Sequence, residues 1–334
     1  MPILNILLIC HGGKNMKKFL ALVLVLCMVV ALGASAFAAD KKELKWGSVH
    51  TEDHLATQMM MKAIDEINEK AEGIHITGYP NSVLGGSQDL VEGVQAGLVE
   101  IITEGPSQFG SMIPKASELE APYLYQSVDH MMKALNGEYK DKLNGLFDTI
   151  GVKIAGTFYY GTRQLTVNKE VHTLDDLKGM KIRVPQADMY VKMIDSWNAA
   201  ATPMALGDLY LALQTGTVDG QENPLTTYDA QKFYETDAKY IVLTNHIICP
   251  NMVFINEAVY NSFSDADKAV FDEAMANAVA WMTEQQQAAE ASMASELEAK
   301  GCTVITPDET IKGATVPYIQ PLVEDWDLIQ SYAD

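Results

Sequence analysis

Two arginines and an asparagine in the middle of the chain are candidates for holding an anion. Arg183 lies in the short run KIRVP, Arg163 follows a glycine in GTRQ, and Asn223 precedes a proline in ENP. A guanidinium on a short rigid strand can bind a carboxylate through two parallel hydrogen bonds, and an amide offers both a donor and an acceptor. The same residue types also occur in surface ion pairs and plain turns, so the residues alone leave both roles open.

Two further polar residues lie at the ends of expected strands. His50 follows the strand expected at 43–49, and Glu104 follows the strand expected at 99–103. Ligands of α/β proteins bind beyond the carboxyl ends of strands, so either side chain could line a pocket. His50 and His54 have the i, i+4 spacing of metal-binding histidines, but their segment is typical of a polar turn before a helix. We therefore expect no metal there.

The chain shows no local signature of a common catalytic site. Neither G-x-S-x-G, G-x-G-x-x-G, a P-loop nor a paired Cys/His site occurs. We therefore expect a binding protein without a cofactor, and keep an exported enzyme acting on small acids as an alternative. Cys249 and Cys302 remain beyond the N-terminal segment, and their spacing does not settle whether they form a disulfide.

Short strands and helices that alternate along the chain position these residues and predict a mainly parallel α/β sheet. The expected strands are 43–49, 74–79, 99–103, 152–160, 165–167, 181–184, 218–221, 240–243 and 252–255. The expected helices are 55–70, 89–96 with Ser87 as N-cap, 130–147, 174–177, 187–197 and 209–214, and residues 106–122 are expected to form a loop.

A last, long helix is expected at 264–300, where neither Gly nor Pro occurs and Ala, Glu, Gln and Met dominate. Ser264 can cap its start and Gly301 can end it. Some 36 helical residues would span roughly 54 Å, more than one domain of this size, so this helix can connect two domains. A break near Ala288 is the alternative.

The first 39 residues have the pattern of a secretory signal peptide. Lys17 and Lys18 precede an apolar run at 19–32, and the small-x-small sequence AFA predicts cleavage near Ala38. Met16 is the better start, which makes the N-terminus over-long. We expect a protein in the periplasm, with a retained membrane anchor as the alternative.

The chain is strongly acidic, with a formal net charge of −20. Without the three lysines of the N-terminal segment, 21 basic residues face 44 acidic ones, a charge of about −23. This excludes nucleic acid and anionic membrane surfaces as expected partners. It does not exclude a small anionic ligand, because charges are screened within about 8–10 Å while a pocket arginine acts at contact distance.

Five segments in fixed order resemble the extracytoplasmic solute-binding proteins of TRAP (tripartite ATP-independent periplasmic) transporters. They are LGGSQDLVEGVQAGLVEI, GTRQLTVNK, LDDLKGMKIRVP, TPMALGDLYLALQTGTVDGQENP and AQKFYE, and the similarity runs from Trp46 to about Pro307. The motifs are closest to organic-acid and sialic-acid members. The resemblance implies an α/β fold of the periplasmic-binding-protein type, with hinge strands and a long helix joining two domains. The first domain would hold 40–160 with about 249–288, and the second about 161–248 with 289–334.

The resemblance also implies roles for the three central residues. Arg183 would clamp the ligand carboxylate, Arg163 would be a second anion contact, and Asn223 would bind the same end of the ligand. Glu104 and His50 remain candidates for the first domain's share of the pocket.

Some positions differ from the sialic-acid members. Leu206 stands where those members place an aromatic residue, and their polar first-domain contacts are replaced by Val49, Ser87 and Gly105. We therefore predict a smaller acid, either a sugar acid or another hydroxylated or dicarboxylic acid.

The function that the resemblance implies is capture of this acid by hinge closure and delivery, as a monomer, to the membrane subunits of a TRAP transporter. A sensor that presents the same ligand to a receptor is the alternative.

Overall fold

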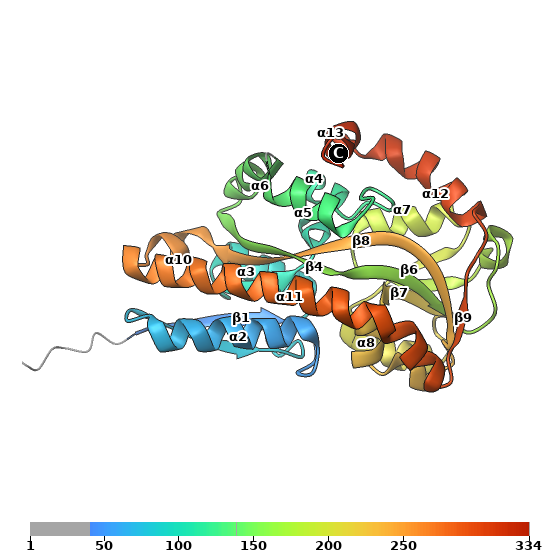
Figure 1. Cartoon of the computed structure of the whole chain (residues 1–334), viewed down its shortest axis with the longest axis horizontal. Coiled ribbons are helices and arrows are strands. Elements are labelled where there is room, and N and C mark those ends of the chain that lie inside the picture. The colour runs from blue at the N-terminus through green and yellow to red at the C-terminus, as the bar shows by residue number, and fades with distance from the viewer. Residues whose placement is uncertain (1–40, 138, 334) are drawn as a thin grey trace, which may run out of the picture. The chain divides into compact units, whose positions relative to one another are not determined.

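The computed structural model describes residues 41–137 and 139–333, and from Lys42 onward they form one compact unit (Figure 1). The expected signal peptide at 1–39 lies outside the described residues. No helix in the described part of the chain combines the length and apolar character needed to cross a bilayer.

The described residues build a mixed sheet of nine strands in the order β2-β1-β3-β8-β4-β7-β5-β6, with β9 paired to β8. The outer strands pair in parallel, β1 with β2 and β3, and β5 with β6 and β7. The central strands β4 and β8 run antiparallel to each other. β4 also pairs antiparallel with β7, and β8 pairs antiparallel with β3. The α/β fold is confirmed, but the sheet is parallel only outside its centre. The strands are β1 (Lys42–Ser48), β2 (Ile74–Tyr79), β3 (Ile101–Glu104), β4 (Val152–Val167), β5 (Lys181–Val184), β6 (Ala200–Pro203), β7 (Gly220–Pro224), β8 (Tyr240–Asn256) and β9 (Thr303–Ile305).

Strands β4 and β8 are each continuous where the sequence predicted two separate strands. Their register shifts at three places, between Ile154 and Gly156, between Tyr159 and Gly161, and between Arg163 and Leu165. Bulges bend a strand and interrupt its alternation of apolar and polar residues, so the sequence pattern breaks although the strand does not. Both long strands therefore connect the group β1–β3 with the group β5–β7.

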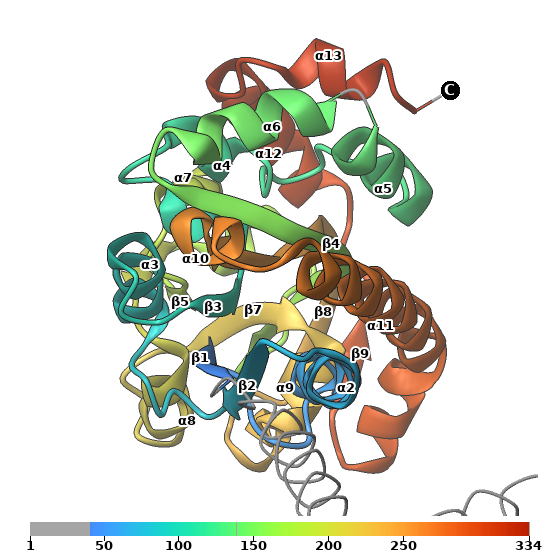
Figure 2. The ribbon, with the colours of Figure 1, turned by 90° about the vertical axis from the view of Figure 1, so that its left-hand side faces the viewer.

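Helices cover the sheet, and Figure 2 shows α5, α6 and α13 on one side of β4 with α2, α8 and α9 on the opposite side. The helices are α2 (Leu55–Lys70), α3 (Ser87–Ala96), α4 (Pro114–Glu118), α5 (Val128–Asn136), α6 (Tyr139–Asp148), α7 (Asp188–Ser196), α8 (Leu206–Gln214), α9 (Leu225–Ala230), α10 (Glu257–Asn261), α11 (Asp265–Ala299), α12 (Thr310–Ile319) and α13 (Trp326–Gln330). Short 3-10 turns lie at Pro106–Phe109, Leu174–Leu177, Phe233–Glu235 and Gln320–Leu322.

Several predicted helix boundaries are wrong for local reasons. The helix expected at 130–147 is two helices, because the backbone at Gly137 (φ −94°, ψ −140°) is not helical. Ser87 is the first residue of α3 and not its cap. Gly86 is the N-cap residue, and its backbone N–H donates a hydrogen bond to the Asp89 carboxylate at 2.9 Å. The loop expected at 106–122 contains a 3-10 turn and α4.

The long helix is confirmed as one unbroken element of 35 residues, α11, without a break near Ala288. The Ser264 side chain caps its start by accepting from the backbone N–H of Asp267, and Gly301 ends it with a φ of +92°. The helix packs against α2, which lies beside the first group of strands, and against α9, which lies beside the second. Figure 1 shows it running along β4, so it spans both groups.

The α11 helix is fastened to a bulge of β4 at Gly161. Glu290 of α11 accepts hydrogen bonds from the backbone N–H of Thr162, at 2.6 Å, and from the hydroxyl of Tyr159. Gly161 has a φ of +138°, and a Cβ there would lie 2.6 Å from the Gln286 side chain. Glycine is therefore required both by the backbone conformation and by the close approach of the helix.

Gly161→Ala is expected to lower the free energy of unfolding by about 3 kcal/mol or more, because backbone strain and a steric clash add at this position. Gly301→Ala is the matched control. Its φ is also positive, but no atom lies within 4 Å of the added Cβ, so only the strain of about 1–2 kcal/mol remains. Urea denaturation of both variants measures the difference. Equal losses would show that α11 does not crowd the bulge.

Candidate functional site

All five residues proposed from the sequence line one cavity of about 60 Å³. Arg163 comes from β4, Arg183 from β5 and Asn223 from β7, while Glu104 ends β3 and His50 follows β1. The cavity therefore receives side chains from both groups of strands and from the long strand that connects them. Its volume is that of a few water molecules, so the surrounding side chains are close enough to contact a small ligand directly.

Arg163 is held by a buried carboxylate. Its Nε donates to Oε2 of Glu222 at 2.5 Å, and its Nη2 donates to Oε1 and to the backbone oxygen of Glu222 at 2.8 and 2.7 Å. Leu165 pairs with Glu222 and Arg163 pairs with Pro224, so Arg163 and Glu222 are diagonal neighbours on the same face of the β4–β7 pair. The ring of Tyr190 lies 5.0 Å from the guanidinium.

Glu222 remains ionised although it is fully buried. Burial raises the pKa of its carboxyl, but the Arg163 charge and the hydrogen bonds from His246 and Arg163 lower it by more. The pKa of Glu222 therefore lies below the ordinary value of 4.5. His246 Nε2 lies 3.0 Å from the carboxylate, and its Nδ1 lies 2.7 Å from the Thr244 hydroxyl. The positive charge of Arg163 is thus balanced within the protein.

Arg183 has no such balance. Its Nε and Nη2 both donate to the backbone oxygen of Met204, at 2.9 and 2.6 Å, and no carboxylate of the described residues lies within salt-bridge distance. Only 3% of Arg183 is exposed. Burial lowers the pKa of Arg183 to about 10, partly offset by Glu222, so the guanidinium is still charged at neutral pH. Arg183 is a buried cation held in place by a neutral carbonyl.

The two guanidiniums use Nε and Nη2 for the hydrogen bonds found among the described residues. This leaves Nη1 of each for a ligand. The Nδ2 of Asn223 donates one hydrogen bond to Oε1 of Gln221 at 2.5 Å. Its second N–H and its Oδ1 are left for the cavity. These donors together can hold a carboxylate.

Glu104 and His50 form a neutral end of the cavity. Burial, with a smaller effect of the Glu120 charge, raises the pKa of Glu104 to about 8 against the opposing hydrogen bonds from Ser87 and Gly105. Burial also lowers the pKa of His50 well below its ordinary value, helped by His54 and Arg163. Glu104 is therefore mostly protonated and His50 uncharged at neutral pH.

His54 has the structural role expected of it. Its Nδ1 accepts from the backbone N–H of Ala56 at 3.0 Å and caps α2, while its Nε2 lies 3.1 Å from the Thr227 hydroxyl. Its ring stacks on His50 with centroids 4.4 Å apart. His54 thus fixes the position of His50 without lining the cavity.

Sequence reasoning missed several lining or supporting residues, namely Glu222, Tyr190, Glu120, Tyr160, Asn251 and Cys249. Glu120 comes from the segment predicted as a loop, where it accepts from the Ser107 N–H at 2.8 Å and from the Tyr190 hydroxyl. Glu222 stands beside Asn223 in the ENP motif, and an alternating strand through that motif was the one signal that could have indicated it. The open question of the cysteines is also settled, because Cys249 and Cys302 are both free and buried.

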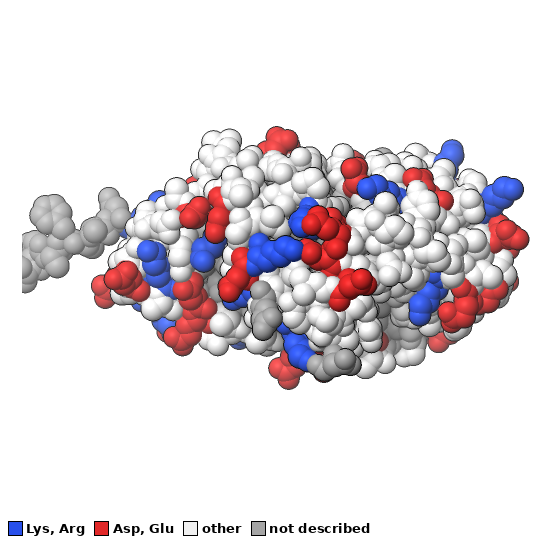
Figure 3. All heavy atoms as spheres, turned by 90° about the horizontal axis from the view of Figure 1, so that it is seen from above, with Lys and Arg blue, Asp and Glu red and all other residues white. Residues whose placement is uncertain are grey.

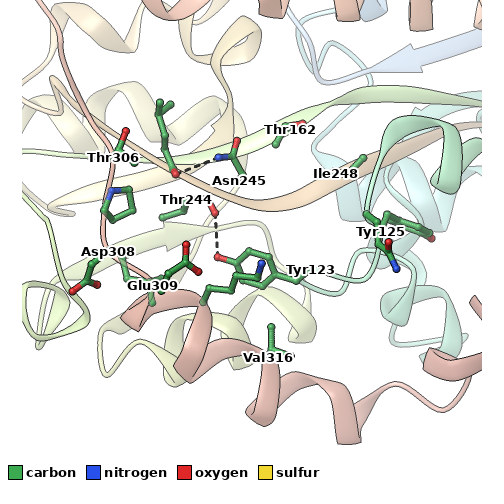
Figure 4. Close-up of a pocket in the computed structure, with 15 residues that line it drawn as sticks. Tyr123, Tyr125, Thr162, Thr244, Asn245, Ile248, Thr306, Asp308, Glu309 and Val316 are labelled. Atoms are coloured by element: carbon green, nitrogen blue, oxygen red, sulfur yellow. Dashed lines mark hydrogen bonds between the residues drawn. The ribbon is translucent and has the colours of Figure 1, made fainter. Parts of the chain in front are cut away.

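A larger hollow of about 680 Å³ lies on the other face of the β4–β8 pair (Figure 4). Thr162 and Ile248 line it, whereas the adjacent Arg163 and Cys249 line the small cavity, as the two-residue period of strands requires. Its charged residues, Asp308, Glu309 and Lys312, are exposed, so water screens them. The charges that line the small cavity are buried, so they interact more strongly with a charged ligand than the exposed charges of the larger hollow do.

A mixed sheet whose two long strands join two groups of shorter strands, with a buried cationic cavity between the groups, is the architecture of a periplasmic-binding type of protein. Residues 46–327 match the family model "Bacterial extracellular solute-binding protein, family 7". The chain belongs to this family, the solute-binding proteins of TRAP transporters, and the predicted resemblance and two-domain fold are confirmed. The family members it matches are binding proteins, which sets aside the enzyme alternative.

Individual relatives cover nearly the whole chain. The sialic acid-binding periplasmic protein SiaP of Vibrio cholerae is 30% identical over 90% of this chain and 92% of its own. A TRAP periplasmic solute binding protein of Roseobacter denitrificans with bound L-galactonate superimposes with a TM-score of 0.83 at 28% identity, covering 88% of this chain and 99% of that chain. Another, from Xanthobacter autotrophicus with bound β-D-galacturonate, gives 0.81 at 29% identity, covering 87% and 99%.

Glu222→Gln is expected to lower the free energy of unfolding by about 3–5 kcal/mol at pH 7, because it leaves the buried Arg163 charge without its counterion. The pKa of Glu222 is lowered in the folded state, so its contribution is present above the ordinary carboxyl value of 4.5 and is lost as the pH falls below it. The loss caused by the variant should therefore shrink in acid.

Urea denaturation at pH 7 and pH 4 measures both effects. Glu92→Gln on the exposed face of α3 is the control, and a change within about 0.5 kcal/mol is expected there. A loss for Glu222→Gln that is as small as the control would contradict the ion pair.

Proposed function

We propose that this protein captures a small organic acid in the buried cavity and delivers it to the membrane subunits of a TRAP transporter. The observation that carries the proposal is Arg183, a buried guanidinium without a carboxylate partner among the described residues. Burying an unpaired charge costs several kcal/mol, so such a group is stable only when a counterion joins it. A ligand carboxylate supplies that counterion.

Three of the solved relatives support an acid of the sugar-acid class, since they hold L-galactonate, β-D-galacturonate and β-D-glucuronate. The attraction has to come from the cavity itself. On the face drawn in Figure 3, acidic and basic side chains are interspersed without a broad basic patch, and the chain as a whole is acidic. Arg183, Arg163 and Asn223 would bind the carboxylate, with Glu104 and His50 at the other end of the ligand.

Closure of a hinge is part of the proposal. The cavity is lined from both groups of strands, so a ligand enters when the groups separate and is enclosed when they meet. Bending would take place at the bulges of β4 and along α11. The predicted domains, 40–160 with about 249–288 and about 161–248 with 289–334, stay a prediction. Asp325 and Ile329, which this prediction assigns to the second domain, contact Lys142 and His130 of the first.

The same proposal places the mature protein in the periplasm as a monomer, after cleavage of the signal peptide near Ala38. Delivery is tested by reconstituting TRAP membrane subunits from the same organism into liposomes. Uptake of the bound acid should require the added binding protein. Uptake that proceeds without it, or fails with it, would favour the sensor alternative.

Arg183→Met is expected to weaken binding of the best acid about 100-fold or more, since it leaves the bound carboxylate buried without its cation, at a cost of roughly 3 kcal/mol. A thermal-shift screen of organic acids identifies that ligand, and isothermal titration calorimetry measures the change.

Lys181→Met is the matched control, because Lys181 is an exposed cation two residues earlier on β5. It should leave affinity within about twofold. If Arg183→Met binds the acid as tightly as the wild type, the carboxylate is held elsewhere and the proposed site is wrong.

A further inference from the structure

The two ends of the cavity differ in charge. At the first end, Glu222 balances Arg163, and Arg183 leaves one positive charge without a protein carboxylate among the described residues. At the second end, Glu104 and Glu120 are both carboxyl groups, His50 is uncharged, and no lysine or arginine of the described residues lies within salt-bridge distance of Glu104. The Arg163 charge acts on Glu120 and His50 as well, but it is already balanced by Glu222, so Arg183 is the one place for a negative charge.

The second end also has unused hydrogen-bonding atoms. Oε1 of Glu104 and Nδ1 of His50 are buried without a partner among the described residues, and the two residues are only 5% and 4% exposed. Buried polar atoms are nearly always hydrogen-bonded, so these two atoms indicate a ligand group that can donate and accept. A hydroxyl does both, whereas a carboxylate only accepts.

We infer that the cavity selects monocarboxylates with a hydroxyl-bearing tail over dicarboxylates, and that Glu104 binds a hydroxyl of that tail. The inference rests on the proposed function and decides between the sugar acid and the dicarboxylic acid that the sequence left open. A second carboxylate would lie beside Glu104 and Glu120 with no free cation to offset its desolvation, and neighbouring carboxyls cannot all ionise.

Arg163 can donate from Nη1 to the first carboxylate, but it cannot easily be the counterion of a second one. For that it would leave Glu222, which is fully buried and would retain only the hydrogen bond of the uncharged His246. Burial is the largest effect on the pKa of His246 and lowers it, so this residue does not replace the lost positive charge. The charge balance of the cavity therefore disfavours two ligand carboxylates at either end.

Matched pairs of acids test the selection, because each pair differs only by a terminal CH2OH or carboxylate. The pairs are D-erythronate with meso-tartrate, L-galactonate with galactarate, and D-gluconate with D-glucarate. Calorimetry at pH 7 should give, for the tightest-binding pair, an affinity at least about 100-fold higher for the monocarboxylate. A dicarboxylate that binds as tightly as its partner overturns the inference.

Failure of the inference and failure of the proposed function give different results. If a dicarboxylate binds well and Arg183→Met abolishes its binding, the carboxylate site stands and only the selection is wrong. If no acid of the wider thermal-shift screen binds the wild type, the proposed function itself is wrong.

Glu104 variants test the residue. Glu104→Leu should weaken the monocarboxylate about tenfold or more, because the hydroxyl loses its partner, and Glu104→Gln should recover most of that loss. Circular dichroism and thermal unfolding check that both variants fold. If Glu104→Leu binds the monocarboxylate as tightly as the wild type does, Glu104 does not bind the ligand.

The pH profile separates hydrogen bonding from packing. Glu104 faces Glu120, Ser87, Gly105 and Tyr160. Its pKa of about 8 means that Glu104 loses its proton between pH 7 and 9, while Arg183 stays charged. Wild-type affinity should fall up to about tenfold over this range, because an ionised Glu104 no longer donates and adds a negative charge. Glu104→Gln should be flat over this range, and Glu92→Gln should keep the wild-type profile. A wild-type profile as flat as that of Glu104→Gln would contradict the role of a protonated Glu104.

Discussion

The unequal pairing of two buried arginines is the constraint on which the site depends. Arg163 has a full counterion in Glu222, itself supported by His246, whereas Arg183 is held by the carbonyl of Met204. In a medium of low polarity an unmatched charge is costly, and the cost is removed when a ligand carboxylate enters. In the proposed function, the paired arginine positions hydrogen-bond donors without changing the net charge of the cavity, and the unpaired arginine sets the charge of the ligand.

In the proposed closure, the need of Arg183 for a counterion depends on whether the two groups of strands are together or apart. Arg183 belongs to the strand group β5–β7, Glu104 and His50 to the group β1–β3, and Arg163 to the long strand β4 that joins the groups. When the groups separate, water can solvate Arg183, and its need for a counterion weakens. A ligand that binds the closed form better therefore shifts the equilibrium toward closure, and the amount of the shift is set by its differential affinity for the two forms.

A protein with a net charge of −20 can still bind an anion because the relevant charges are buried. Screening confines the field of the exposed acidic residues to about 8–10 Å, while hydrogen bonds inside the cavity act at contact distance in a less polar medium. The same reasoning explains why the larger hollow beside Tyr123 and Lys312 is a weaker candidate, since its charges remain in water (Figure 4).

Patterns local to the sequence were enough to predict most of the helices and strands and the residue types of the proposed carboxylate site. Apolar periodicity located α2, β2 and β5 at their observed bounds, helix-forming composition and capping residues predicted α11, and short motifs indicated Arg163, Arg183 and Asn223. Tertiary structure alone decided that β4 and β8 are continuous, because bulges hide a strand's alternation, and that α5 and α6 are separate. It also decided which arginine is neutralised, since the Arg163–Glu222 pair follows from the register of strands some 59 residues apart in sequence. The unpartnered atoms of Glu104 and His50 were equally out of reach, because burial and the absence of a partner depend on everything packed around a residue and not on its neighbours in the chain.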